Sequence, residues 1–154
     1  MLNVEVRVAI ILACYNRRDR TLHCLERLYR AAAKVPYAKL SVFLLDDASP
    51  DGTGNVVSQH YPTVKVIQGS GELFWNRGMH RAMTIAMEER FDHYLWLNDD
   101  TMLAESALAN FFETSNRIRE RTGNDGIVVG TTETEFGSGV ATYGGRVRPS
   151  KWRP

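Results

Sequence analysis

The chain has 154 residues, of which 44% are hydrophobic and 24% charged, and its formal net charge is +1. This length and composition suit one globular domain with a hydrophobic core, and the small net charge gives no electrostatic reason to expect binding to nucleic acid or to a membrane surface. Cys14 and Cys24 lie in apolar patterns, which indicates reduced core thiols. No run reaches the roughly 18 apolar residues needed to span a bilayer, and the start of the chain has no signal-peptide pattern. We therefore expect a cytoplasmic protein.

Apolar runs and helical patterns alternate along the chain. Residues 6–14 and 40–45 are almost continuously apolar, as in strands that are buried on both faces of a parallel sheet. Leucines at three- and four-residue spacing predict a helix after the first strand, with Asp19 as its N-cap. The other expected elements are helices at about 53–60, 76–90 and 105–121, strands at 64–67, 93–97 and 126–132, and one further short strand within 140–148.

This alternation determines the expected fold class. Parallel strands need crossover connections, which are usually helices and wind right-handed. We therefore predict an α/β fold, an open, mostly parallel twisted sheet with helices on both faces. The sequence contains no internal repeat, low-complexity stretch or linker, so residues 1–154 are expected to form a single domain.

Three of the expected strands end on polar residues. The segments that follow strands one, two and four are 15–17 (YNR), 46–47 (DD) and 98–100 (NDD). Ligands of open α/β sheets bind at the carboxyl ends of the strands. A solvated turn that caps the next helix would explain one acidic pair. Two such pairs at equivalent strand ends favour a site for a hard cation, which prefers carboxylate oxygens and is often shared with substrate phosphates.

Other ligand sites fit the sequence less well. No G-x-G-x-x-G follows the first strand, and no G-x-x-x-x-G-K-[ST] occurs anywhere, which argues against a dinucleotide site and a P-loop. No cysteine and histidine residues have the spacing of zinc ligands. A signalling receiver domain carries its acidic pair after strand one, where this chain has YNR.

Four motifs occur in order on these elements: ILACYNRRD, VFLLDDASPDGT, GELFWNRGMHRAM and YLWLNDDTML. Together they resemble the nucleotide-binding half of the inverting family 2 glycosyltransferases, which have the Rossmann-like GT-A fold. The resemblance extends from about Val6 to Leu103 and continues towards Gly145. It implies that a sugar passes, with inversion, from a nucleoside diphosphate sugar to an acceptor hydroxyl, in cell-surface polysaccharide biosynthesis.

The resemblance also implies which residues bind the nucleotide. Ala13 and Tyr15 would line the base pocket, and Asn16 and Arg17 would lie on the loop beside it. Asp47, the second acid of the DDAS motif, would accept a hydrogen bond from a pyrimidine ring.

The NDD motif would hold the rest of the donor. Asp99 would lie by the ribose, and Asp100 would ligate Mg²⁺ or Mn²⁺ between the two phosphates of a UDP- or dTDP-sugar. The cation would relieve the repulsion between the two carboxylates and stabilise the leaving diphosphate as a Lewis acid. The sugar carbon would become oxocarbenium-like, and a general base, usually a carboxylate, would take the proton of the acceptor.

The chain departs from the family pattern in two respects. Trp75 stands where many relatives have an arginine, directly before the asparagine of the third motif, here Asn76. A diphosphate contact is then expected from Arg77 or Arg81, while Trp75 either stacks near the sugar or packs. The second departure is length, because the family's catalytic base and acceptor site come from a later segment, beyond Pro154. We expect an incomplete domain, truncated on its C-terminal side, that transfers sugar poorly alone and self-associates through an open sheet edge.

Two functions therefore remain open. The first is a glycosyltransferase, or its donor-binding half, that acts on a glycan or lipid-linked acceptor and makes at most peripheral membrane contact. The second is a non-catalytic nucleotide-binding or regulatory α/β module. The two differ in whether a general base acts on an acceptor.

Overall fold

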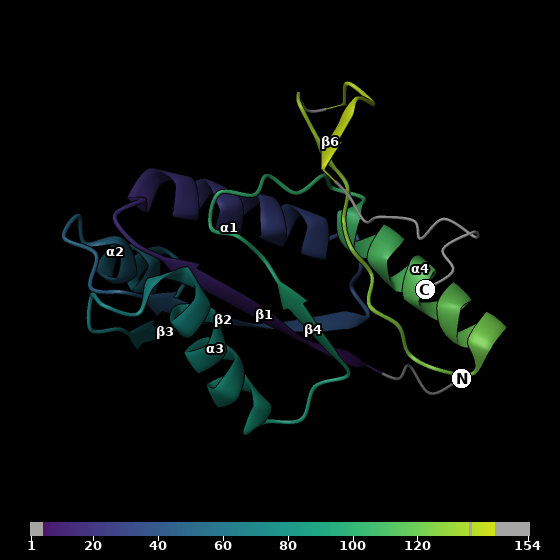
Figure 1. Cartoon of the computed structure of the whole chain (residues 1–154), viewed down its shortest axis with the longest axis horizontal. Coiled ribbons are helices and arrows are strands. Elements are labelled where there is room, and N and C mark those ends of the chain that lie inside the picture. The colour runs from purple at the N-terminus through teal and green to yellow at the C-terminus, as the bar shows by residue number, and fades with distance from the viewer. Residues whose placement is uncertain (1–4, 136, 144–154) are drawn as a thin grey trace, which may run out of the picture. The chain divides into compact units, whose positions relative to one another are not determined.

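The structure is a computed structural model that describes residues 5–135 and 137–143, and Figure 1 shows its strands and helices. The strands are β1 (Val6–Cys14), β2 (Ala38–Asp46), β3 (Lys65–Gln68), β4 (His93–Trp96), β5 (Thr132–Glu133) and β6 (Ala141–Tyr143). The helices are α1 (Arg18–Ala32), α2 (Thr53–His60), α3 (Phe74–Met87) and α4 (Ala107–Thr122). The chain divides into two compact units, residues 1–105 and 106–154, each with a sheet of its own.

The first unit is built on a four-stranded parallel sheet in the order β3-β2-β1-β4. The two central strands, β1 and β2, are each nine residues long. Successive strands are connected through α1, α2 and α3. The prediction of an open parallel α/β sheet is confirmed, and strands one, two and four are neighbours in it.

Both faces of the central strands are buried. Ala9, Ile11 and Ala13 of β1 belong to a core cluster with Met79 and Ala82 of α3. The intervening residues of β1 are equally buried, and α1 and α2 lie on the other side of the sheet from α3 (Figure 1). Burial on both faces is why the sequence of β1 is apolar without alternation.

One local prediction in this unit is wrong. Asp19 is not the N-cap of α1, because Asp51 from the loop before α2 accepts the N–H of Arg18 at 2.9 Å, and Asp19 lies inside the first turn. The pKa of Asp51 is lowered, since hydrogen bonds from Thr53 and Arg18 outweigh the effect of burial. The last strand of the sheet, β4, lies at the sheet edge, and Trp96 is 51% exposed.

The second unit contains α4 and a small antiparallel pair, β5 and β6. The predicted strand at 126–132 is wrong, since β5 begins only at Thr132. The segment before it runs along α4 instead: a Cβ on Gly126 would lie 2.9 Å from Ile118, and one on Gly130 would lie 3.1 Å from Phe111. The further strand predicted within 140–148 is found at 141–143, and residues 144–148 lie outside the described residues. No helix of the described part is long and apolar enough to cross a membrane.

Candidate functional site

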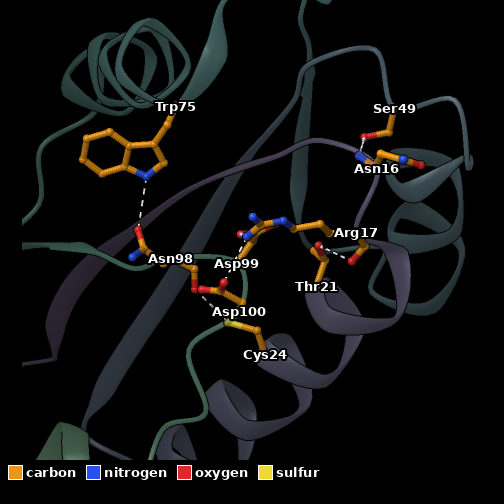
Figure 2. A network of polar contacts seen from close by, with 9 residues as sticks. All are labelled: Asn16, Arg17, Thr21, Cys24, Ser49, Trp75, Asn98, Asp99 and Asp100. Carbon is orange, nitrogen blue, oxygen red and sulfur yellow. Dashed lines mark hydrogen bonds and ion pairs between the residues drawn. The ribbon is translucent and has the colours of Figure 1, made fainter. Parts of the chain in front are cut away.

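The loops after β1, β2 and β4 meet at the carboxyl end of the parallel strands, which we call the rim. The strands are parallel neighbours, so their carboxyl ends lie on the same side. The N–H of Asn16, after β1, donates to Ser49 Oγ, after β2, at 3.0 Å. Arg17 extends from the same loop to the NDD segment after β4 (Figure 2). The convergence expected from the sequence therefore exists in the fold.

One arginine compensates the acidic pair of the NDD segment. Arg17 Nη1 donates to Asp99 Oδ1 at 3.3 Å and to Asp100 Oδ2 at 2.9 Å. Asp99 is only 6% exposed, and within residues 5–135 and 137–143 no hydrogen-bond partner reaches its Oδ2. Burial raises the pKa of Asp99, the Arg17 guanidinium opposes that rise, and the Asp100 carboxylate adds to it. The buried carboxylate is thus only partly compensated.

The site fits a cation that arrives with a phosphate ligand. The described residues contain no group of three or more His, Cys, Asp or Glu side chains arranged to hold a metal ion. Asp99 and Asp100 provide two carboxylates, and one of them keeps a buried oxygen without a partner. Mg²⁺ is often bound by one or two carboxylates, with water and substrate phosphates completing its coordination. A site of this kind needs no third protein ligand.

Asp46, the first acid of the DDAS motif, fixes the start of α2. Its Oδ2 accepts the N–H of Gly54 at 3.0 Å, and its Oδ1 accepts the N–H of Ser49 at 3.1 Å. A Cβ on Gly54 would overlap Asp46 Oδ2. The residue therefore connects the end of β2 to the next helix, as the capping explanation of an acidic pair requires.

Asp47, the second acid, holds the loop that leads into α3. Its Oδ1 accepts the N–H of Gly71 at 2.8 Å, and its Oδ2 accepts those of Leu73 and Phe74 at 2.9 Å each. Asp47 is 5% exposed. The carboxylate expected to contact a pyrimidine is therefore already engaged by three backbone N–H groups.

Backbone strain is concentrated at the rim. Among the residues that the structure describes, three that are not glycine have a positive φ: Asn16 (54°), Ala48 (58°) and Phe74 (54°). Such conformations cost about 1–3 kcal/mol each and persist where surrounding contacts hold them, often at ligand sites. Hydrogen bonds to Ser49 and Asp47 hold the N–H groups of Asn16 and Phe74. The strain supports a binding role for this edge of the sheet.

Trp75 joins α3 to the NDD segment. Its Nε1–H donates to Asn98 Oδ1 at 3.1 Å (Figure 2), and its ring meets Trp96 edge to face, with centroids 6.2 Å apart. Both indole rings are about half exposed. Arg77 Nη2 donates to the Glu72 carbonyl oxygen at 2.5 Å. Trp75 thus lies at the rim, while the guanidinium of Arg77 contacts the preceding loop.

The remaining expected site residues differ in exposure. Tyr15 is 55% exposed at the end of β1, and Asn76 is exposed on α3. Ala13 is buried in the core, and a Cβ on Gly78 of α3 would lie 3.2 Å from its Cβ. Ala13 therefore contributes to the packing under the rim and only 8% of it is exposed.

Some contacts at the site were not predicted. Cys24 Sγ donates to the Asn98 carbonyl oxygen at 3.4 Å, and burial raises the pKa of this thiol to about 12, so that it keeps its proton. The N–H and hydroxyl of Thr21 both donate to the carbonyl oxygen of Arg17, at 2.9 and 3.0 Å. Asn98 lies 74 residues from Cys24 in sequence, so no local pattern indicated this contact. Both cysteines are buried free thiols, as predicted.

The fold is shared with solved glycosyltransferases. The mannosyltransferase PcManGT from Pyrobaculum calidifontis, solved with GDP-Man and Mn²⁺, matches with a TM-score of 0.54 at 23% identity, over 70% of this chain and 31% of that chain. S. aureus TarS, residues 1–349, matches with a TM-score of 0.61 at 16% identity, over 94% of this chain and 38% of that chain. The chain thus spans less than two fifths of either protein. These similarities confirm the GT-A type of α/β fold.

The sequence also matches a family model. The model of glycosyl transferase family 2 matches residues 9–142, which reach into both compact units. The chain therefore belongs to glycosyl transferase family 2, as its motifs suggested. No curated protein matches it closely enough to count as a relative.

Proposed function

We propose that this chain binds a nucleoside diphosphate sugar at the rim and forms the donor side of an inverting, divalent-cation-dependent glycosyl transfer. The observation that carries the proposal is the Asp99–Asp100 pair, in which one buried carboxylate oxygen has no described partner. Membership of glycosyl transferase family 2 supports a sugar donor. The GDP-Man and Mn²⁺ bound to PcManGT support a nucleotide sugar with a cation. We take residues 1–154 as one domain, since the family match reaches into both units.

The nucleotide is proposed to lie along the loops after β1 and β4. Tyr15, half exposed at the end of β1, would cover the base, with Asn16 beside it and Ala13 beneath. The free oxygen of Asp99 would accept a ribose hydroxyl. Asp100, which is more exposed than Asp99, would face the diphosphate and its cation. A ribose hydroxyl would thus supply the hydrogen bond that the buried Asp99 Oδ2 lacks among the described residues.

The sugar end of the donor is proposed to lie towards α3. Trp75, Asn76 and Arg77 line the first turn of this helix, and the half-exposed ring of Trp75 offers an apolar face for a sugar. A bound divalent cation supplies Lewis-acid stabilisation of the charge that develops on the leaving diphosphate. The acceptor hydroxyl must pass its proton to a general base, a role that we assign to none of the described residues.

The finer identity of the reaction is also a proposal. We favour UDP or dTDP as the nucleotide, a glycan or lipid-linked acceptor, and a cytoplasmic role in cell-surface polysaccharide synthesis, since the motifs resemble those of enzymes with these properties. Asp47 is the residue expected to discriminate between bases. It can do so through the loop that it holds as well as by direct contact.

Calorimetric titration with UDP, dTDP and GDP, in Mn²⁺ and in EDTA, tests the proposal. At a ligand concentration of 100 times Kd, the same binding should stabilise the fold by about 2.7 kcal/mol. Asp100→Ala should lose the part of the affinity that depends on Mn²⁺. A substitution of Asp47 should weaken nucleotide binding both in Mn²⁺ and in EDTA. Asp19→Ala, which removes a highly exposed carboxylate on α1, is the matched control.

The outcomes separate the candidate functions. Equal nucleotide affinity of wild type and Asp100→Ala in Mn²⁺ would show that the acidic pair holds no cation. Donor hydrolysis or transfer to an acceptor would exclude the non-catalytic module, whereas nucleotide binding alone is also expected of the donor-binding half. If no nucleotide binds, the proposed donor site is wrong. The anomeric configuration of a transfer product, read by NMR, would decide between inversion and retention.

A further inference from the structure

Arg17 occupies the position between the two carboxylates of the NDD segment. A single nitrogen, Nη1, bridges Asp99 Oδ1 and Asp100 Oδ2 at 3.3 and 2.9 Å (Figure 2). A divalent cation held by these two carboxylates would lie close to this nitrogen. A guanidinium and a dication repel each other at such a separation. The arginine and the cation therefore compete for the same pair of oxygens.

The backbone of Arg17 is fixed, but its side chain is free to exchange partners. Thr21 holds the carbonyl oxygen of Arg17 with two hydrogen bonds, of 2.9 and 3.0 Å. The side chain itself is 48% exposed, and its described polar partners are the two carboxylates. In the Arg17–Asp100 pair both side chains are more than a third exposed. Such exposed ion pairs are weak, so a dication can displace the guanidinium at little cost.

The present pairing is also incomplete. It leaves Asp99 Oδ2 buried without a described partner, and the guanidinium engages the pair through one nitrogen instead of the two-pronged geometry that makes arginine–carboxylate pairs strong. The same guanidinium is suited to phosphate oxygens, which it binds with two parallel hydrogen bonds. A diphosphate at the rim would give Arg17 a better partner than the carboxylates do.

We propose that Arg17 is an exchangeable counter-ion. It neutralises Asp99 and Asp100 in the empty site and moves to the diphosphate of the nucleotide when a divalent cation takes its place. This inference rests on the proposed function, because it needs a nucleotide and a cation at the rim. It adds a role that family membership does not assign: the cation makes the arginine available to the nucleotide, so the two ligands bind cooperatively.

The test is a comparison of Arg17→Met with wild type by calorimetric titration of this chain. Without nucleotide, Arg17→Met should bind Mn²⁺ roughly five-fold more tightly, since the competing ion pair is gone. With saturating Mn²⁺, it should bind UDP roughly ten-fold more weakly, because a charge-assisted phosphate contact is lost. In EDTA the loss of UDP affinity should be much smaller, because Arg17 then stays with the carboxylates. GDP titrated in parallel provides a second nucleotide probe.

Arg18→Met is the matched control. Arg18 is the next residue, has nearly the same exposure (47%), and pairs with Asp19 instead. It should leave both Mn²⁺ and UDP binding close to wild type. If Arg17 does not exchange partners, Arg17→Met should weaken UDP binding by the same factor in Mn²⁺ and in EDTA. That result would overturn the exchange.

A second measurement uses the wild-type chain and does not depend on how Arg17→Met folds. The NMR signal of the Arg17 Nε–H group can be assigned by its loss in Arg17→Lys. Its chemical shift should change when Mg²⁺ is added alone and change again when UDP follows. A signal that Mg²⁺ leaves unchanged would overturn the exchange. The wild type could bind Mn²⁺ and UDP while Arg17→Met and Arg18→Met have equal affinities for both ligands. That result would overturn the exchange and leave the proposed function intact. Wild type that binds neither would reject the proposed function itself.

Discussion

Asp47 and Asp99 are buried carboxylates at the same rim, but their charges are compensated in different ways. Asp47 accepts three backbone N–H groups, all from the loop that begins α3. Asp99 accepts one arginine N–H at 3.3 Å, and its Oδ2 has no hydrogen-bond partner among the described residues. The first arrangement is complete without a ligand and therefore stabilises the fold. The second leaves a buried acceptor without a described partner, which costs stability.

Replacement of Asp47 by asparagine should therefore destabilise the protein. The substitution removes the negative charge and turns an N–H₂ group towards backbone donors, so at least one buried N–H loses its acceptor. We expect a loss of about 2–4 kcal/mol in the free energy of unfolding, measured in urea. Asp19→Asn, at an exposed position of α1, should change it by less than about 0.5 kcal/mol. Equal stability of the two variants would mean that other contacts hold the loop.

Asp99→Asn should act in the opposite direction at neutral pH. Burial raises the pKa of Asp99 above its ordinary value of 3.8, so the folded state holds this proton more tightly than the unfolded state does. The resulting stabilisation is present below pH 3.8 and is lost as the pH rises through the folded pKa. Asp99→Asn should thus be more stable than wild type at pH 7, and the difference should shrink on acidification. Urea unfolding of both proteins at pH 7 and at acidic pH measures this difference in stability. A variant less stable than wild type at pH 7 would contradict the prediction.

At the level of elements, the approach of α3 to the sheet decides where Trp75 lies. Gly78 faces Ala13 of β1 and Leu45 of β2, and a Cβ there would lie 3.2 and 3.1 Å from their side chains. Since helix residues normally gain stability when glycine becomes alanine, the glycine indicates close packing. The sheet and α3 can approach this closely because Gly78 has no side chain and Ala13 has only a methyl group.

We expect Gly78→Ala to destabilise the protein by about 1 kcal/mol, because overpacking of about 1–3 kcal/mol exceeds the gain in helix propensity. Ala13→Gly should recover part of this loss in a double-mutant cycle, since it removes the methyl group that the new Cβ meets. The cycle is measured by urea unfolding of the four proteins. Additive effects of the two substitutions would show that the contact does not limit the approach of α3.

At the level of the whole molecule, the exposed edge of the sheet is the feature that predicts association. In the described part of the chain β4 pairs with β1 alone, and it carries the partly exposed side chains of Tyr94 and Trp96. An edge strand with apolar side chains recruits other chains. The strand β5 does not extend this sheet, because it pairs with β6 in a separate sheet.

The weight-average mass from light scattering should therefore rise with protein concentration. Trp96→Lys should reduce this rise, since a charge on the edge strand disfavours pairing between chains. Met87→Lys, which places the same charge at an exposed position on α3, is the control and should leave the association unchanged. A monomer at every concentration would show that the edge is protected.

The sequence by itself determined the parallel α/β fold, because apolar runs buried on both faces and intervening helical patterns are local and periodic. It also located the polar segments, since YNR, DDAS and NDD each follow a predicted strand directly. Only the tertiary structure decided which carboxylates are structural. The acidic pairs after β2 and β4 look alike in sequence, but backbone N–H groups more than twenty residues away surround Asp47, while Arg17, 82 residues away, reaches Asp99. Compensation of a buried charge depends on groups brought together through space, and no local pattern encodes it.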